Sequence, residues 1–324
     1  MVLARDERKE EIKHWLRDHT PFSAKNLEVA SADASFRRYF RFSDKGKSWI
    51  VMDAPPDLEP CEPFVRIARQ MKEAGVEVPE ILAQDLNKGF LALSDFGDIH
   101  FRDELEGPQR EGIYDHAISE IVKFQTRLTE MSQTLPVFDT VWQRKELEIF
   151  REWCLPECSE QTFAQAITPL VEAVDAIPKA FMHRDFHSRN ILIPSPGEIG
   201  VIDFQGAMLG PVSYDLVSLL RDCYVDNEEE WISQKTTGFQ LNLVHAGALD
   251  HKIKDVDFLR WLDLAGLQRH LKCIGIFHRL KIRDGKDGYL KDVPRVKRYV
   301  ETVLARNPEL GAIEKLYKRA KTLA

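Results

Sequence analysis

The sequence predicts an α+β protein with a small, mainly antiparallel β N-terminal lobe and a larger, mainly α C-terminal lobe. Short β-branched and aromatic runs, separated by turn-forming residues, follow one another between residues 27 and 93. From residue 110 onward, apolar residues recur at helical spacing in long segments. Between these regions, the turn-forming segment 94–98 interrupts the last strand, so we expect lobes at 1–97 and 98–324.

The composition is typical of an ordinary soluble globular protein. The 324 residues are 44% hydrophobic and 30% charged, and the net charge of −7 argues against nucleic acid as a default partner. The N-terminus is charged where a signal peptide is apolar, and no apolar run approaches the roughly 20 residues of a membrane helix. Five scattered cysteines fit reduced thiols. We therefore expect a cytoplasmic protein with no membrane, nucleic-acid or obligate protein partner.

The N-terminal lobe should hold a surface helix at residues 5–18 and a second helix at 63–74, which Pro63 can begin and Gly75 can end. The strands are expected at 27–30, 36–42, 48–54, 78–83 and 90–93. In the larger lobe, helices are expected at 113–128, 142–155, 161–177, 214–224, 228–246, 256–281, 292–306 and 313–323.

The turn between the first two strands is a candidate phosphate site. Small hydroxyl residues at a hairpin tip let backbone N–H groups approach phosphates. Ser35 and Phe36, with Arg37 or Arg38 just beyond, are therefore candidate contacts to the β- and γ-phosphates. The alternative is a solvated arginine face on an edge hairpin. Neither the P-loop pattern nor the dinucleotide-binding glycine pattern occurs in the sequence.

A second nucleotide-binding candidate lies at the predicted lobe boundary. Ser94, Asp95 and Phe96 would run between the lobes. A connecting segment offers backbone N–H and C=O groups that can read the edge of an adenine base. The alternative is a plain linker.

Residues 181–205, FMHRDFHSRNILIPSPGEIGVIDFQ, contain the chemically informative pattern. Asp185 closes a His-Arg-Asp triplet, Asn190 follows five residues later, and Asp203 follows a predicted strand–turn–strand hairpin. Asp185 can orient a bound alcohol and accept its proton, whereas Asn190 and Asp203 offer hard oxygen ligands for Mg²⁺ on nucleotide phosphates. Phosphoryl transfer needs little beyond positioning, metal and charge neutralisation. The pattern therefore predicts an enzyme that uses ATP and Mg²⁺. The alternative is a charged loop beside an ordinary hairpin.

The pattern H-R-D-x-x-x-x-N followed by D-F resembles the catalytic set of the protein-kinase-like fold. The order of segments resembles the aminoglycoside phosphotransferase and choline kinase superfamily over nearly the whole chain. This resemblance implies a bilobal protein-kinase-like fold and a small-molecule kinase. The roles it implies are catalytic base for Asp185, magnesium ligands for Asn190 and Asp203, γ-phosphate contact for His187 and a loop brace for Asp215.

A closer resemblance is to the bacterial anomeric kinases of N-acetylmuramate and N-acetylglucosamine. It implies transfer of the ATP γ-phosphoryl group to the C1 hydroxyl of such an amino sugar, in cell-wall sugar recycling. The alternatives are another acceptor, such as an aminoglycoside, choline or homoserine, and a nucleotide-binding pseudokinase module. The strings that support this resemblance are residues 33–41, 51–56, 210–222, 267–272 and 283–290.

Two positions depart from the wider family pattern. Asp53 stands where the phosphate-binding strand lysine is expected, so the replacement cation would be Arg37, Arg38 or Lys47. Gln205 stands where protein kinases have glycine, which favours a fixed substrate wall and a small-molecule acceptor.

The lactyl carboxylate of N-acetylmuramate would require a cation near the acceptor. The sequence offers several and does not choose among them: Arg189, Arg269, His270, Arg279 and Arg283. The residues that we assign to substrate binding are Gln205, Arg269, His270 and Arg279.

Overall fold

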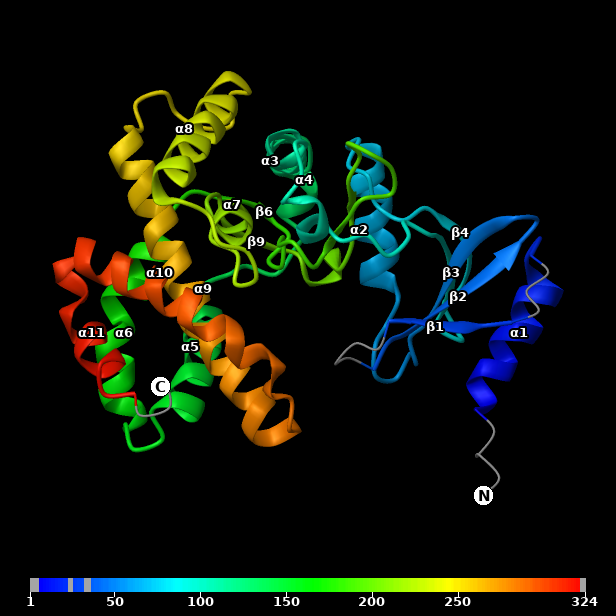
Figure 1. Ribbon diagram of the computed structural model, residues 1–324, viewed down its shortest axis with the longest axis horizontal. Coiled ribbons are helices and arrows are strands. Elements are labelled where there is room, and N and C mark those ends of the chain that lie inside the picture. Colours follow the sequence, from blue (N-terminus) through cyan, green and yellow to red (C-terminus); the bar gives the residue numbers. More distant parts are fainter. Residues whose placement is uncertain (1–5, 23–25, 32–35, 321–324) are drawn as a thin grey trace. The chain divides into compact units, whose positions relative to one another are not determined.

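The computed structural model describes residues 6–22, 26–31 and 36–320. The chain divides into two compact units, one formed by Met1–Ile99 with Leu192–Gln205 and the other by His100–Ile191 with Gly206–Ala324. Figure 1 shows strands concentrated in the first unit and helices in the second. The predicted α+β class is confirmed. The lobe limits stay a prediction, because residues 192–205 group with the N-terminal unit although they follow residue 97.

The N-terminal unit is built on a five-stranded antiparallel sheet with the order β1-β2-β3-β5-β4. The β2–β3 hairpin turns at Lys45 and Gly46, which both have positive φ, as its tight turn requires. Its register places Arg38 directly opposite Asp53. The strands are β1 (Glu28–Ser31), β2 (Arg38–Asp44), β3 (Lys47–Asp53), β4 (Ile81–Asp85) and β5 (Phe90–Ser94).

Helix α1 (Glu7–His19) packs its apolar stripe on this sheet (Figure 1). The carboxylate of Asp6 caps the helix by accepting the Lys9 N–H at 3.2 Å. Helix α2 (Glu62–Glu73) begins one residue before Pro63, which lies in its first turn as predicted. The buried core beneath α1 consists of Ile12, Trp15, Leu16, Leu27, Phe40, Phe42, Val51, Phe90 and Ala92.

The C-terminal unit is organised around one long helix, α9 (Asp255–Asp284), which is buried on most sides through its middle. A Cβ atom on Gly275 would lie 2.6 Å from the backbone nitrogen of Phe150, so glycine permits the close approach of α5. The other helices are α3 (Arg110–Arg127), α4 (Thr129–Ser132), α5 (Thr140–Cys154), α6 (Glu160–Asp175), α7 (Tyr214–Leu220), α8 (Glu229–His245), α10 (Val293–Arg306) and α11 (Gly311–Tyr317).

Two helices are shorter than predicted, and the one expected at 313–323 ends at Tyr317. The expected helix at 214–224 ends at Leu220. The Asp222 carboxylate accepts the N–H groups of Tyr224 and Ser188, both at 2.8 Å. These contacts replace the helical hydrogen bonds that would have continued α7.

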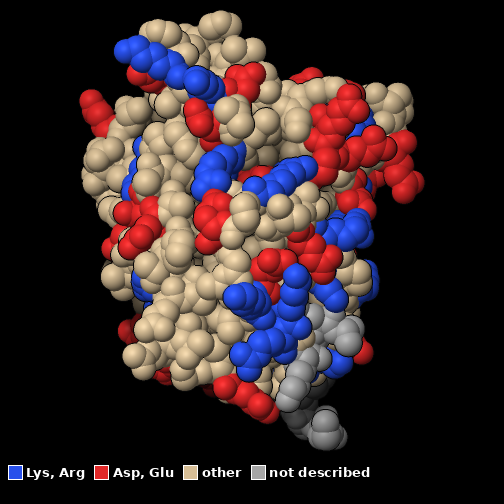
Figure 2. Space-filling view, turned by 90° about the vertical axis from the view of Figure 1, so that its left-hand side faces the viewer, with Lys and Arg blue, Asp and Glu red and all other residues tan. Residues whose placement is uncertain are grey.

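Two surface properties bear on the partners expected from the sequence. On the face in Figure 2, Lys and Arg side chains lie among Asp and Glu side chains. In the described part of the chain, none of the helices combines the length and apolarity needed to cross a bilayer.

Candidate active site

The loop after β6 (Lys179–Met182) carries the predicted catalytic residues. This strand pairs with β9 (Met208–Pro211) and leads directly into His183. Asp215, in the first turn of α7, is fully buried and accepts the backbone N–H groups of His183 at 2.6 Å and Arg184 at 2.9 Å. Burial raises the pKa of Asp215 to about 7, although the two N–H groups favour its charged form. The loop-bracing contact predicted for Asp215 is confirmed.

Arg184 has a backbone conformation that is rare outside glycine. Its φ is 80°, a strained value that costs roughly 1–3 kcal/mol and persists only where the surroundings hold it. The side chain supplies an anchor, because Nη2 and Nε donate to Glu146 Oε1 at 2.9 and 3.2 Å. The guanidinium also lies 5.5 Å from the centre of the Trp142 ring. The strain is therefore held immediately before Asp185, where it helps to shape the loop.

Asp185 is partly buried among cations. Burial raises the pKa of its carboxyl, but the charges of Lys272 above all, and of Arg184 and Arg269, bring it down to about 2. The group is therefore ionised at neutral pH. An ionised carboxylate is a hydrogen-bond acceptor only, so it can hold a hydroxyl that donates to it.

The sequence predicted no role for Lys272, Tyr214 and Glu146, which form a buried polar group next to this loop. Lys272 on α9 donates from Nζ to the Tyr214 hydroxyl at 3.2 Å, and the same Nζ lies 3.5 Å from Glu146 Oε2. Glu146 also accepts from Gln268 Nε2 at 3.1 Å. A usable signal was present, because a lysine and a glutamate inside buried helices must be paired. The sequence could not identify the pair, however, because Glu146 lies on α5 and Lys272 on α9.

His187 is placed between Asp185 and Asn190 by the loop backbone. Its N–H donates to the Asp185 carbonyl at 3.1 Å, and its carbonyl accepts the Asn190 N–H at 2.8 Å. Burial lowers the pKa of the ring to about 4, so it is neutral at pH 7. Its Nδ1 has no hydrogen-bond partner among the described residues. The contact to a γ-phosphate stays a prediction.

The predicted metal ligands belong to two different units. The side-chain N–H of Asn190 donates to the Asp185 carbonyl at 3.0 Å. The amide oxygen is therefore the atom of Asn190 that would bind a metal. Asp203 is exposed, has φ 65° and accepts a hydrogen bond from Gln205. An amide and a carboxylate oxygen are donors that Mg²⁺ prefers. No described residues form a cluster of three or more His, Cys, Asp or Glu suited to a metal.

The segment Asp203–Gln205 ends the hairpin formed by β7 (Ile191–Leu192) and β8 (Gly200–Val201). Phe204 is fully buried, and its ring centre lies 4.8 Å from that of Phe64 on α2. The Gln205 amide nitrogen is used by Asp203, whereas its Oε1 has no partner in the described part of the chain. Its role as a substrate wall stays a prediction.

Asp53, which stands where the wider family has a phosphate-binding lysine, is paired with two arginines. Asp53 is fully buried and accepts from Arg8 Nε at 2.9 Å and Arg38 Nε at 3.0 Å. Arg38 also donates to Asp6 at 2.5 Å, so two carboxylates already balance its charge. Arg37 is likewise paired, with Glu59 at 2.6 Å. These contacts favour structural roles for both arginines, and phosphate binding by Arg38 stays a prediction.

The two other phosphate candidates lie before β2. Ser35 falls outside the described residues. Phe36 was expected to begin a strand, but β2 starts at Arg38 and the Phe36 side chain is 64% exposed. Its role in phosphate binding stays a prediction.

At the predicted adenine site, the side chains of Ser94, Asp95 and Phe96 contact neighbouring protein residues. The Ser94 hydroxyl accepts a backbone N–H at 2.9 Å, and Asp95 is held by Arg41 through contacts of 2.6 and 3.0 Å. The Phe96 ring fills the space where Gly200 lacks a Cβ. Any base contact would therefore use backbone groups, and it stays a prediction.

The three α9 residues assigned to substrate have different surroundings. His270 is fully buried with Nε2 2.9 Å from the Arg221 carbonyl, which favours packing over substrate contact. Arg269 is buried and donates to Cys223 Sγ at 3.4 Å. Arg279 is partly buried, and its Nε lacks a partner within the described residues. All three assignments stay predictions.

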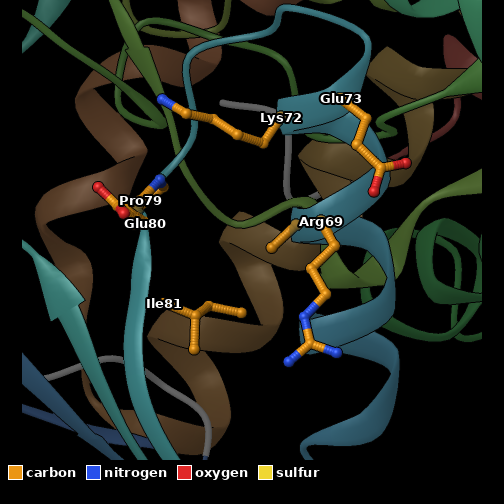
Figure 3. A pocket seen from close by; sticks show the side chains of 7 residues that line it. Arg69, Lys72, Glu73, Pro79, Glu80 and Ile81 are labelled. Carbon is orange, nitrogen blue, oxygen red and sulfur yellow. The ribbon is translucent and has the colours of Figure 1, made fainter.

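A hollow of about 310 Å³ between α2 and the start of β4 contains none of the predicted site residues (Figure 3). Its basic side chains are engaged, because Lys72 pairs with Glu77 at 2.9 Å and Arg69 donates to Gln84 at 3.0 Å. Nothing in its lining indicates a ligand.

Known proteins resemble this chain in sequence and fold. Proteins named N-acetylmuramate/N-acetylglucosamine kinase are 42% identical over 298 residues in Pseudomonas aeruginosa and 39% over 317 residues in Pseudomonas putida. These matches cover 90% and 95% of this chain, and 87% and 92% of the relatives. A Neisseria meningitidis protein of the same name is 37% identical over 321 residues, or 95% of this chain and 94% of the relative.

Solved structures share the fold at low identity. Plasmodium vivax ethanolamine kinase aligns with a TM-score of 0.61 at 12% identity, covering 92% of this chain and 96% of that one. A spectinomycin phosphotransferase bound to ADP and spectinomycin gives 0.57 at 15%, covering 90% and 93%. The model of the phosphotransferase enzyme family matches residues 26–249. The chain therefore belongs to the phosphotransferase enzyme family.

Proposed function

We propose that this protein transfers the γ-phosphoryl group of ATP to the anomeric C1 hydroxyl of N-acetylmuramate and N-acetylglucosamine. The observation that carries the proposal is an ionised Asp185 on a loop braced by Asp215. The 42% identity to a kinase named for these sugars, over 90% of the chain, supports the choice of acceptor. We place the reaction in the cytoplasm, where ATP is available and where the five free cysteines would stay reduced.

In the proposed reaction, the C1 hydroxyl donates a hydrogen bond to Asp185 and its oxygen attacks the γ-phosphorus as ADP leaves. A carboxyl with a pKa of about 2 is a weak base, so it cannot remove the proton early. Its main contribution is to orient the hydroxyl, and it receives the proton once the bond to phosphorus is forming. This suits a loose transition state, in which positioning matters more than nucleophile activation.

The acceptor's own chemistry complements a weak base. An anomeric hydroxyl is more acidic than an ordinary alcohol, so it needs less help in losing its proton. Bound Mg²⁺ would neutralise charge on the phosphates. The residues that would hold it are Asn190 and Asp203, whose donor atoms fit the ion. The product would be a sugar 1-phosphate, which fits cell-wall sugar recycling.

The decisive assay measures ADP release with Mg²⁺-ATP and a panel of acceptors: N-acetylmuramate, N-acetylglucosamine, an aminoglycoside, choline and homoserine. We expect turnover with the two amino sugars and an acid-labile product, because a phosphate on C1 is a glycosyl phosphate. An acid-stable monoester would move the reaction to another hydroxyl. Turnover only with the other acceptors, or with none, would overturn the proposal.

A further inference from the structure

Arg189 lies on the catalytic loop, four residues after Asp185, within a group of aromatic rings. Its guanidinium carbon is 4.9 Å from the centre of the Tyr224 ring and 5.3 Å from that of Tyr289. Tyr224 follows α7, and Tyr289 lies in a 3-10 helix, η3 (Asp287–Asp292), beyond the end of α9. Three separate segments of the C-terminal unit therefore meet at this one side chain.

The surrounding rings fix this arrangement. Tyr224 meets the His187 ring edge-to-face at 5.5 Å and lies 6.2 Å from Phe277. Phe277 in turn stacks on Tyr289 at 5.6 Å with an angle of 22°. Gly285, with φ 65°, ends α9 and redirects the chain toward Tyr289. The rings thus form a continuous wall beside the catalytic loop.

Several arginines of this unit have an acidic partner, whereas Arg189, Arg269 and Arg279 have none among the described residues. Arg184 is held by Glu146, Arg221 by Asp263 and Arg283 by Asp284, at 2.9, 2.7 and 2.7 Å. None of the carboxylates in the described ranges pairs with Arg189, although its side chain is partly buried.

The rings leave Arg189 able to bind an anion. A guanidinium has five N–H donors in one plane. Aromatic rings lie against the guanidinium, and the Tyr289 and Tyr224 side chains accept hydrogen bonds from part of it, so its remaining N–H donors are the ones available to a carboxylate or phosphate. A partly desolvated cation of this kind gains when an anion pairs with it.

We propose that Arg189 binds the carboxylate of an anionic acceptor, namely the lactyl carboxylate that N-acetylmuramate has and N-acetylglucosamine lacks. This inference rests on the proposed function. The neighbouring tyrosines favour an acceptor over the triphosphate, because aromatic faces pack against the C–H face of a sugar ring. Of the other candidate cations, His270 is fully buried and Arg283 is already paired. Arg189 is thus the cation on the catalytic loop that is best placed to bind the acceptor's carboxylate.

The test compares kcat/KM for the two sugars in wild type, Arg189→Gln and Arg189→Lys. For Arg189→Gln we expect a loss of ~10–100-fold on N-acetylmuramate, the size of a lost charge-assisted hydrogen bond. On N-acetylglucosamine we expect a change within ~3-fold, which also reports that the variant is folded. Arg189→Lys keeps the charge but loses the planar fork, so its loss on N-acetylmuramate should be intermediate.

A matched control is available in Arg110, which lies over Tyr114 at 5.2 Å and Trp231 at 4.7 Å. Arg110→Lys should leave the preference between the sugars unchanged. Equal losses on both sugars with Arg189→Gln, together with a raised KM for ATP, would overturn the inference and indicate a phosphate contact. Wild-type turnover of N-acetylglucosamine without N-acetylmuramate would overturn it while leaving kinase activity established. Turnover of neither sugar would instead refute the proposed function.

Discussion

Replacing Lys272 tests how the buried charges around Asp185 set its ionisation. Lys272→Met removes the cation that contributes most to lowering the pKa of Asp185, while keeping much of the side-chain volume. Glu146 would keep Arg184 at 2.9 Å and Gln268 at 3.1 Å, so it is not left without partners. We therefore expect the variant to fold with its loop anchored.

The size of the effect follows from the charge removed. An opposite charge nearby shifts a carboxyl by roughly 1–3 in pKa, so Asp185 should rise from about 2 to ~3–5. The folded pKa stays below or near that of an exposed aspartate, so at pH 7 the carboxylate remains ionised and kcat changes little through protonation. At about pH 4, a group with pKa ~3–5 is ~10–90% ionised, whereas one with pKa ~2 is ~99% ionised. The variant should therefore lose up to ~10-fold more activity than wild type between about pH 7 and 4, with the larger loss for the larger shift.

The assay is kcat for ADP release at saturating substrates from about pH 4 to 8, limited to conditions where circular dichroism shows folded protein. Lys235→Met is a suitable control, because Lys235 on α8 pairs with Glu111 at 2.9 Å and Asp115 at 2.5 Å, both on α3. Its profile should follow that of wild type. If the Lys272→Met profile also superimposes on wild type down to about pH 4, Lys272 does not set the charge state of Asp185.

Three further predictions concern the base, the brace and the helix core. Asp185→Asn should lower kcat by ~10²–10⁴-fold with little change in ATP affinity, and near-normal turnover would remove its assignment as base. Asp215→Ala leaves one buried and one partly buried backbone N–H group unpaired and should cost ~2–5 kcal/mol in urea unfolding; an unchanged midpoint would show that the brace is dispensable. Gly275→Ala places a Cβ 2.6 Å from the Phe150 nitrogen and should destabilise by ~1–3 kcal/mol. Gly238→Ala, with open space around it, should be neutral or stabilising, and equal behaviour of the two would contradict the packing argument.

Local patterns located most of the elements and the candidate catalytic residues. Periodicity predicted the strands of the N-terminal sheet and most helices because side-chain burial repeats every two residues in a strand and about every 3.6 in a helix. The short elements β9 and α4 were not predicted. The spacing of Asp185, Asn190 and Asp203 predicted phosphoryl transfer because it matches the catalytic pattern of the protein-kinase-like fold and supplies an acceptor carboxylate and two oxygen ligands for Mg²⁺. The helix at 214–224 was predicted too long, since its end depends on the contacts of Asp222 with Ser188 and Tyr224.

The sequence by itself determined that this is an α+β phosphotransferase, and it predicted reactive residues near 183–203. The tertiary structure decided what surrounds them: Lys272 joins Glu146 near Asp185, and Arg8 joins Asp53 across 45 positions. The physical reason is that periodicity and turn chemistry are local, whereas ion pairs between distant segments depend on how the elements pack. A buried charge implies that a partner exists, but only the folded structure shows which residue it is.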